Sequence, residues 1–184
     1  MNLDELIETI PSYAKDLKLN FSSVVRQQTH LSEQQAWGTL VATAIASRNE
    51  GLTRAALEEA ATHLSPEALE AAKGAAAIMG MNNIYYRFLH LVEDPEYAKL
   101  PARLRMNVIG SPGIAKADFE LLALAVSAIN GCGTCVASHE RQLRQHGLQR
   151  EAVQSAVRIA ATVHAVARVL ESVGETRSGR AQAA

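Results

Sequence analysis

Residues 119–139 read FELLALAVSAINGCGTCVASH, and this stretch sets the expectations for the rest of the chain. Its first half, residues 119–129, is an apolar run typical of a buried helix. Asn130-Gly131 is a turn signal that interrupts the run, and the chain after Cys132 has the pattern of a new helix. The stretch therefore predicts two consecutive helices joined by a tight turn, with two cysteines at the start of the second helix.

Cys132 and Cys135 are the only cysteines of the chain, and His139 follows four residues after the second one. On a helix, separations of three and four residues bring these side chains to one face. The unpaired N–H groups and the dipole at a helix N-terminus favour a thiolate over a thiol. The pattern indicates a redox-active dithiol with an acid/base group beside it.

Two other interpretations of the motif stay open at this point. The cysteines could be two small buried thiols with a structural role. They could also bind zinc, together with His139 and a fourth ligand. The candidates for that fourth ligand are His146, His164 and Glu120. Structural zinc sites usually combine two ligand clusters, whereas this chain has one. A thioredoxin fold is not expected, because no β-α-β pattern precedes the motif.

The composition indicates a soluble helical protein. The chain has 184 residues, of which 48% are apolar and only 4% aromatic, so its core must be built from alanine, leucine, valine and isoleucine. A net charge of −1 gives no basic surface, and we expect neither a nucleic-acid nor a membrane partner. Residues 1–5 are acidic and lack the features of a signal peptide. We therefore expect a cytoplasmic protein, where a C-x-x-C pair is more often catalytic or metal-binding than structural.

The order of helix signals predicts an all-α chain in two halves. Ser32 begins one helix, with Gln35 in the capping-box position, and Ser65-Pro66-Glu67 begins a long alanine-rich one. We predict an N-terminal helical half at 1–95, a linker at 96–116, a C-terminal half with the redox site at 117–173, and a disordered tail at 174–184. No alternating strand pattern occurs.

The two halves resemble each other, which argues for an internal duplication. Thr43-Ala44-Ile45 corresponds to Ser127-Ala128-Ile129 at a separation of 84 residues, and the alanine pattern after Leu64 corresponds at the same separation to that after Leu148. At this separation the redox residues align with Arg48, Gly51 and Ala55. The N-terminal half is therefore expected to be a scaffold without redox chemistry, leaving one active site per chain.

Two polar features lie inside apolar helical patterns. Asn82-Asn83 is an unusual pair in such a place, and we expect these buried amides to form hydrogen bonds between helices or between subunits. His164 lies inside the last apolar helix, where a hydrogen-bonded core histidine is expected.

The block Glu120-(x11)-Cys132-x-x-Cys135-x-x-x-His139 resembles the signature of the alkylhydroperoxidase D (AhpD) family, within the carboxymuconolactone decarboxylase superfamily. The resemblance extends over residues 1–172. It includes the segments Pro11–Asp16, Trp37–Leu40, Ala75–Asn83, Leu104–Asn107 and Ala125–Cys132.

This resemblance implies an all-helical fold with an internal repeat, assembled as a homotrimer. It implies a dithiol peroxidase that reduces alkyl hydroperoxides and also regenerates the peroxiredoxin AhpC. No bound cofactor is implied. Electrons would come from dihydrolipoamide on a lipoyl-bearing acyltransferase, supplied by dihydrolipoamide dehydrogenase. The lactone decarboxylation known elsewhere in the superfamily is less favoured, because that chemistry needs no dithiol.

The resemblance also implies a role for each residue of the block. Cys135 would be the peroxidatic cysteine, which forms the sulfenic acid and the mixed disulfide with AhpC. Cys132 would be the resolving cysteine and proton donor, and His139 and Glu120 would form the proton relay. The chain departs from the family motif at Thr134, where the best-known form has a histidine. A hydroxyl does not titrate near neutral pH, so an acid/base role of that position is lost or moves to His139.

The position of Glu120 is not explained by spacing alone. It lies twelve residues before Cys132, about 18 Å away along a continuous helix. The chain must fold back, or a neighbouring subunit must supply the contact. Without a contact to the histidine, Glu120 would be a helix N-terminal carboxylate stabilised by the dipole.

Overall fold

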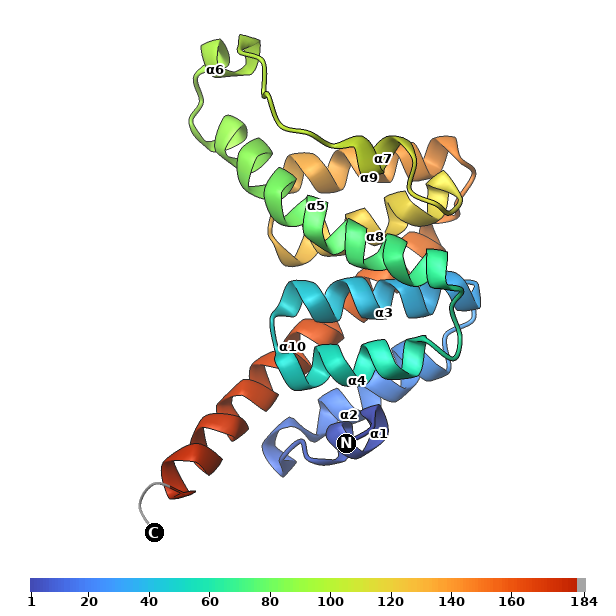
Figure 1. Ribbon diagram of the computed structural model, residues 1–184, viewed down its shortest axis with the longest axis vertical. Helices are drawn as coiled ribbons and strands as arrows, with labels where there is room; N and C mark the ends of the chain where they lie inside the picture. Colours follow the sequence, from blue (N-terminus) through green and yellow to red (C-terminus); the bar gives the residue numbers. More distant parts are fainter. Residues whose placement is uncertain (182–184) are drawn as a thin grey trace.

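The computed structural model describes residues 1–181, and every regular element in this part of the chain is helical (Figure 1). The all-α prediction is confirmed. The main helices are α1 Leu3–Glu8, α2 Lys15–Phe21, α3 Glu33–Ser47, α4 Glu50–Ala60, α5 Pro66–Leu91, α6 Pro95–Lys99, α7 Asn107–Gly110, α8 Lys116–Ile129, α9 Gly133–Gln145 and α10 Arg150–Ala181. Two short segments, a 3-10 helix at Ser12–Ala14 and a π-helix at Ser22–Arg26, flank α2.

The helix starts follow the capping signals of the sequence. Ser32 and Gln35 form the predicted capping box at the start of α3, with each side chain accepting a hydrogen bond from the other residue's backbone N–H. At the start of α5 the Ser65 side chain accepts from the N–H of Ala68, and Pro66 occupies the first turn. These caps satisfy N–H groups that have no partner within the helix.

The predicted internal repeat is confirmed in the helix order. Helices α3, α4 and α5 recur as α8, α9 and α10, and each helix of the second set begins 83 or 84 residues after its counterpart. Gln34 and Asp118, which are 84 residues apart, meet directly at a distance of 2.7 Å between Nε2 and Oδ2. In Figure 1 the pair α3–α4 lies below the pair α8–α9.

The core lies between the two copies, where α3 packs against α8. The third helix of each repeat contacts both halves of the protein. Helix α5 packs against α3, α8 and α9, and helix α10 packs against α3 and α8. Small residues let these helices approach closely. A Cβ atom at Gly38 of α3, for example, would lie 3.2 Å from Leu122 of α8. Helix α9, which begins directly after Cys132 and contains Cys135, is therefore held on a core built from both repeats.

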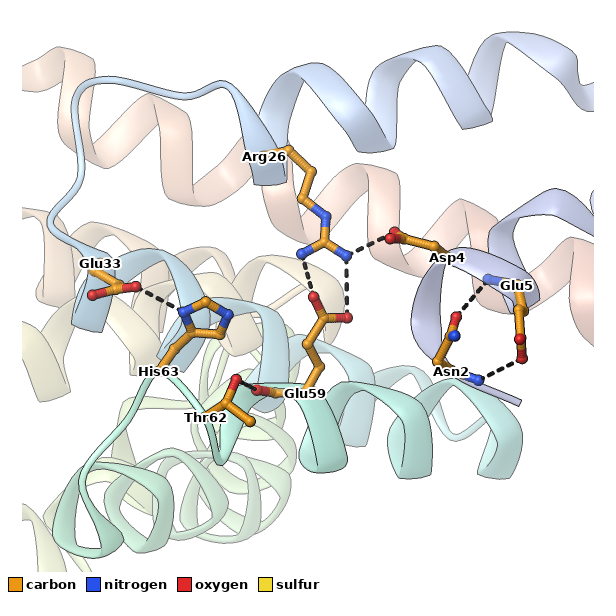
Figure 2. Close-up of polar contacts among 8 residues, drawn as sticks. All are labelled: Asn2, Asp4, Glu5, Arg26, Glu33, Glu59, Thr62 and His63. Atoms are coloured by element: carbon orange, nitrogen blue, oxygen red, sulfur yellow. Dashed lines mark hydrogen bonds and ion pairs between the residues drawn. The ribbon is translucent and has the colours of Figure 1, made fainter.

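Polar contacts fix the N-terminal helices to the first repeat (Figure 2). The Arg26 guanidinium bridges the carboxylates of Asp4 on α1 and Glu59 on α4. Its pKa is raised, chiefly by the hydrogen bond to Glu59. The same guanidinium lies 5.2 Å from the ring centroid of Trp37, and His63 stacks on that ring with centroids 4.1 Å apart.

The segment predicted as a linker, residues 96–116, contains most of α6 and all of α7. Three of its partly buried side chains, Val108, Ile109 and Ile114, pack against the core. The helix α10 extends beyond residue 173, the predicted end of the C-terminal half. The last residues of the predicted tail, 182–184, lie outside the described residues, and the predicted division into halves stays a prediction.

A search of the described helices found none that is both long and apolar enough to cross a membrane.

The turn between α8 and α9 yields a stability prediction. Gly131 has a φ of +68°, and open space surrounds the position where a Cβ atom would stand. Gly131→Ala should therefore lower the free energy of unfolding by about 1 kcal/mol through backbone strain alone. Urea unfolding of the disulfide-bonded protein measures this change.

Gly133 is the matched control, since it also has open space around it but lies in the first turn of α9 with an ordinary φ. Gly133→Ala should be neutral or stabilising, because alanine favours the helix. Equal destabilisation by both substitutions would contradict the strain explanation.

Candidate active site

The turn between α8 and α9 determines where the sulfur atoms lie. The last turn of α8 is closed by hydrogen bonds from Gly131 N to Ala128 O and from Cys132 N to Ser127 O. The positive φ of Gly131 then reverses the chain, and α9 begins at Gly133. Cys132 is the N-cap of α9, and its Sγ accepts a hydrogen bond of 3.3 Å from the N–H of Cys135. The predicted position of both sulfurs at a helix N-terminus is therefore confirmed.

The two cysteines are bonded to each other in a disulfide. Their exposure to solvent differs, because Cys132 is fully buried while Cys135 retains 7% of its surface. Cys135 also lines a pocket on the surface of the protein. A reagent that enters from solvent therefore meets Cys135 before Cys132. In the reduced protein, the N–H groups of the first turn of α9 would favour a thiolate here.

Glu120 and His139 form a buried pair within one chain. Their Oε2 and Nδ1 atoms are 2.6 Å apart, and their side chains are only 7% and 13% exposed. Helix α9 folds back along α8, so the eleven residues between Glu120 and Cys132 do not separate Glu120 from the site. Since a carboxylate can only accept, Nδ1 of His139 donates the hydrogen bond to Glu120. This leaves Nε2 as the nitrogen that can exchange a proton with another group.

The pocket beside Cys135 has a volume of about 370 Å³ and is lined by three parts of the fold. Helix α5 contributes Met79, Asn82 and Tyr86; the segment around α7 contributes Met106 and Ile109; helix α9 contributes Thr134, Cys135, Ser138, His139 and Arg141. The wall formed by α5 and α7 is mostly apolar, with Asn82 as its amide, and the wall formed by α9 carries the reactive groups. Such a pocket suits a molecule with an apolar body and a reactive polar end.

A second layer of hydrogen bonds fixes the turn that carries the cysteines. Asn83 of α5 donates from Nδ2 to Ser127 Oγ at 2.8 Å and accepts at Oδ1 from Asn130 Nδ2 at 2.9 Å. Arg87, one turn further along α5, donates to the backbone oxygen of Asn130 at 2.5 Å. These contacts hold α5 against the end of α8, directly before Cys132.

The expectation of hydrogen bonds between helices or between subunits is confirmed for Asn83, which bonds between helices. For Asn82 the described chain shows no bond between helices, and a bond between subunits stays a prediction. Asn82 Oδ1 is buried and has no hydrogen-bond partner among the described residues. Sequence reasoning did not identify Arg87, Ser138, Arg141 or the pocket residues before α8. A signal was present for Ser138 and Arg141, which lie three and six residues after Cys135 on the same helix. For Arg87 and the α7 segment no local signal exists, because tertiary packing brings them to the site.

Two further expectations concern histidine and metal. His164 is hydrogen-bonded as predicted, with Nδ1 3.3 Å from Ser47 Oγ, and its pKa is lowered by burial and by the nearby Arg168 cation. Among the side chains that the structure describes, those of residues 1–173, no group of three or more His, Cys, Asp or Glu is arranged to hold a metal ion. The sulfurs proposed as zinc ligands are instead bonded to each other.

Comparison with known proteins gives results that agree with this geometry. The model of the carboxymuconolactone decarboxylase family matches residues 95–177. A protein of Gluconacetobacter diazotrophicus named alkyl hydroperoxide reductase AhpD is 64% identical over 171 residues, which cover 93% of each chain. Proteins of the same name from Acidobacterium capsulatum and Streptomyces avermitilis are 58% and 55% identical and cover 94% of this chain, and 94% and 97% of their own lengths. The resemblance inferred from the C-x-x-C block is confirmed, and the chain belongs to the AhpD family.

Proposed function

We propose that this chain is an antioxidant thiol peroxidase that reduces alkyl hydroperoxides through a Cys132/Cys135 dithiol–disulfide cycle. The proposal rests on how three groups lie together. Cys135 lines a pocket, and its sulfur is bonded to that of buried Cys132. His139, which is hydrogen-bonded to a carboxylate, lines the same pocket. The name alkyl hydroperoxide reductase AhpD, borne by relatives that cover nearly the whole chain, supports the same activity.

The first step oxidises Cys135. His139 takes the proton of the Cys135 thiol, and the thiolate sulfur attacks the terminal oxygen of the hydroperoxide R–O–O–H. A sulfur–oxygen bond forms while the oxygen–oxygen bond breaks, and the bonding electron pair leaves with the alkoxide RO⁻. The Cys132 thiol supplies the proton that turns this alkoxide into an alcohol. Cys135 is then a sulfenic acid and Cys132 a thiolate.

The second step closes the disulfide. The Cys132 thiolate attacks the sulfur of the Cys135 sulfenic acid, and the hydroxide that leaves takes the proton held by His139 to become water. Because the two cysteines are three residues apart with Cα atoms 5.3 Å from each other, this closure needs little backbone movement and runs at high effective concentration. The net reaction converts one dithiol and one hydroperoxide into one disulfide, one alcohol and one water.

The Glu120–His139 pair acts as the proton relay in this scheme. The carboxylate holds the imidazole ring in one orientation and stabilises the imidazolium that forms when Nε2 takes a proton. The low exposure of both side chains strengthens the interaction, because water screens it less than at the surface. Thr134, which borders the pocket where the family motif has a histidine, can offer a hydrogen bond but no proton exchange near neutral pH. An acid/base role of that position therefore moves to His139, which acts together with Glu120 and Cys132.

An external dithiol returns the site to its reduced state. We propose dihydrolipoamide on a lipoyl-bearing acyltransferase, recharged by dihydrolipoamide dehydrogenase in the cytoplasm, as this donor. Its thiolate attacks Cys135, which is the sulfur that lines the pocket, and a second thiol releases the reduced enzyme. The reduced site would pass its electrons to oxidised AhpC through a mixed disulfide on the same cysteine. The apolar wall formed by Met79, Tyr86, Met106 and Ile109 suits the hydrocarbon part of a lipoyl group.

We further propose that three copies assemble through the far end of α5. Ile84, Phe88 and Leu91 are exposed there at helical spacing, and Tyr97 and Leu100 add to the same apolar surface through the contact between Phe88 and Tyr97. This end of α5 and α6 projects from the rest of the molecule in Figure 1. Contiguous exposed apolar side chains are typical of a subunit interface.

The proposed reaction is tested with the two cysteine variants. The unchanged protein should consume tert-butyl hydroperoxide with dihydrolipoamide as reductant, and Cys135→Ser should abolish this turnover because the attacking sulfur is gone. Cys132→Ser should also stop turnover but still react once, leaving a sulfenic acid on Cys135. Mass spectrometry with a sulfenic-acid trap measures the difference. A Cys135→Ser protein that still turns over hydroperoxide would show that the assignment is wrong.

The proton relay is tested by Glu120→Gln. The amide keeps the shape of the side chain but removes its charge, so the imidazolium loses its counter-ion. We expect the rate of Cys135 oxidation by hydroperoxide to fall roughly tenfold to hundredfold, a typical range for a lost acid/base contribution. Stopped-flow fluorescence against pH measures it.

Glu140→Gln is the matched control, since it removes a negative charge from the residue directly after His139, while the ion pair of the histidine is made with Glu120. Its rate should stay within about twofold of the unchanged protein. A similar loss in both variants would indicate a general effect of charge and not a relay.

The trimer is tested with two leucines of similar exposure. Leu91→Glu should give monomers in light scattering coupled to gel filtration, because burying a charge in the interface is unfavourable. Leu19→Glu, on α2, changes an equally exposed leucine outside the proposed interface and should leave a trimer. A trimeric Leu91→Glu protein would exclude this surface as the interface.

A further inference from the structure

Asn82 and Asn83 are neighbours on α5, yet their side chains have opposite surroundings. The carboxamide of Asn83 forms two hydrogen bonds: its nitrogen donates to Ser127 and its oxygen accepts from Asn130. Asn82 is only 5% exposed, and its Oδ1 is buried without a hydrogen-bond partner in the described part of the chain. A buried polar atom without a partner lowers the free energy of unfolding, so such atoms are rare in folded proteins.

The location of Asn82 gives this unpaired amide a possible use. Asn82 lines the same pocket as Cys135 and His139. Met79 and Tyr86 lie three residues before it and four residues after it, so all three belong to the stripe of α5 that borders the pocket. Since no hydrogen bond fixes the carboxamide, rotation about its last side-chain bond can bring either its oxygen or its nitrogen to a molecule in the pocket.

We propose that Asn82 binds the hydroperoxide group of the substrate and directs its terminal oxygen toward Cys135. This assignment rests on the peroxidase activity proposed above. A hydroperoxide has one O–H donor and two oxygen acceptors, while a carboxamide has both an acceptor and donors. With Nδ2 turned to the pocket, the carboxamide of Asn82 donates a hydrogen bond to the oxygen that becomes the alkoxide.

This hydrogen bond acts on the step that breaks the peroxide bond. The Cys135 sulfur forms a bond to the terminal oxygen, the oxygen–oxygen bond breaks, and the electron pair leaves on the second oxygen. Negative charge therefore develops where Nδ2 of Asn82 donates, and the proton that completes the alcohol comes from Cys132. Asn82 supplies neither electrons nor a proton, but a donor that faces developing charge speeds such a step.

Asn82 should affect the reaction with hydroperoxide and not the reaction with the dithiol donor. Thiols and disulfides are weak hydrogen-bond partners, so Asn82 has little to offer a dithiol donor. Its contribution should therefore appear in the oxidation of the enzyme by hydroperoxide and not in reactions with sulfur compounds. This difference provides the test.

The experiment measures the reduced protein and its Asn82→Leu variant with two oxidants. Leucine has a similar shape but forms no hydrogen bond. With tert-butyl hydroperoxide, we expect the second-order rate of dithiol oxidation to fall about tenfold to hundredfold. With 2,2′-dithiodipyridine, a disulfide that has no peroxide oxygen, the rate should not change. The thermal unfolding midpoint should stay the same or rise, because the unpaired buried amide has been removed.

Asn83→Leu is the contrasting variant. It breaks the contacts that hold the turn before Cys132, so it should lower the unfolding midpoint and slow both oxidants. If Asn82→Leu behaves in this way, or if it leaves the hydroperoxide rate unchanged, Asn82 does not bind the substrate. Asn82→Ala provides the same kinetic comparison if the leucine variant does not fold.

The outcomes also distinguish this assignment from the proposed function. An unchanged protein that reacts with dithiodipyridine but with no hydroperoxide would contradict the peroxidase activity itself. If the unchanged protein reacts with both oxidants and the Asn82→Leu variant reacts with each at the same rate, only the role of Asn82 is contradicted.

Discussion

The hydrogen bond between Glu120 and His139 is the interaction on which the proposed chemistry depends. It joins the start of α8 to the middle of α9 at 2.6 Å, and it exists only because the chain reverses direction at Gly131. That reversal also makes Cys132 the N-cap of α9. One turn thus positions both the sulfurs and the histidine that serves them. The supporting contacts from Asn83 and Arg87 of α5 act on this same turn.

The internal duplication explains how a small all-helical protein holds this turn firmly. The two repeats, α3–α5 and α8–α10, pack against each other in the core. The third helix of each repeat, α5 or α10, also contacts helices of the other repeat. Only the second copy carries thiols, since Arg48 and Gly51 stand at the equivalent positions of the first. The first copy is predicted to be a scaffold for α8 and α9, and its third helix, α5, forms one wall of the pocket.

Local features of the fold could be predicted from the sequence, whereas contacts between distant segments could not. The caps at Ser32 and Ser65 and the N-terminal position of Cys132 follow from short-range chemistry, and each is present. The contact of Glu120 with His139 depends on antiparallel packing, which spacing does not determine. The same limit applies to Asn82 and Asn83, since their sequence neighbourhood is nearly identical and only their three-dimensional surroundings differ.

The capping of α9 by Cys132 has a consequence for the reduction potential of the pair. In the disulfide, a neutral sulfur accepts the hydrogen bond from Cys135 N–H. Once electrons are added, an anionic sulfur at the helix start is a stronger acceptor and meets the positive end of the dipole. The helix therefore stabilises the electron-rich form, and the couple becomes a better oxidant than a pair of cysteines in an unfolded peptide. The helix start thus raises the reduction potential of the cysteine pair, and this makes reduction of the disulfide by an external dithiol more favourable.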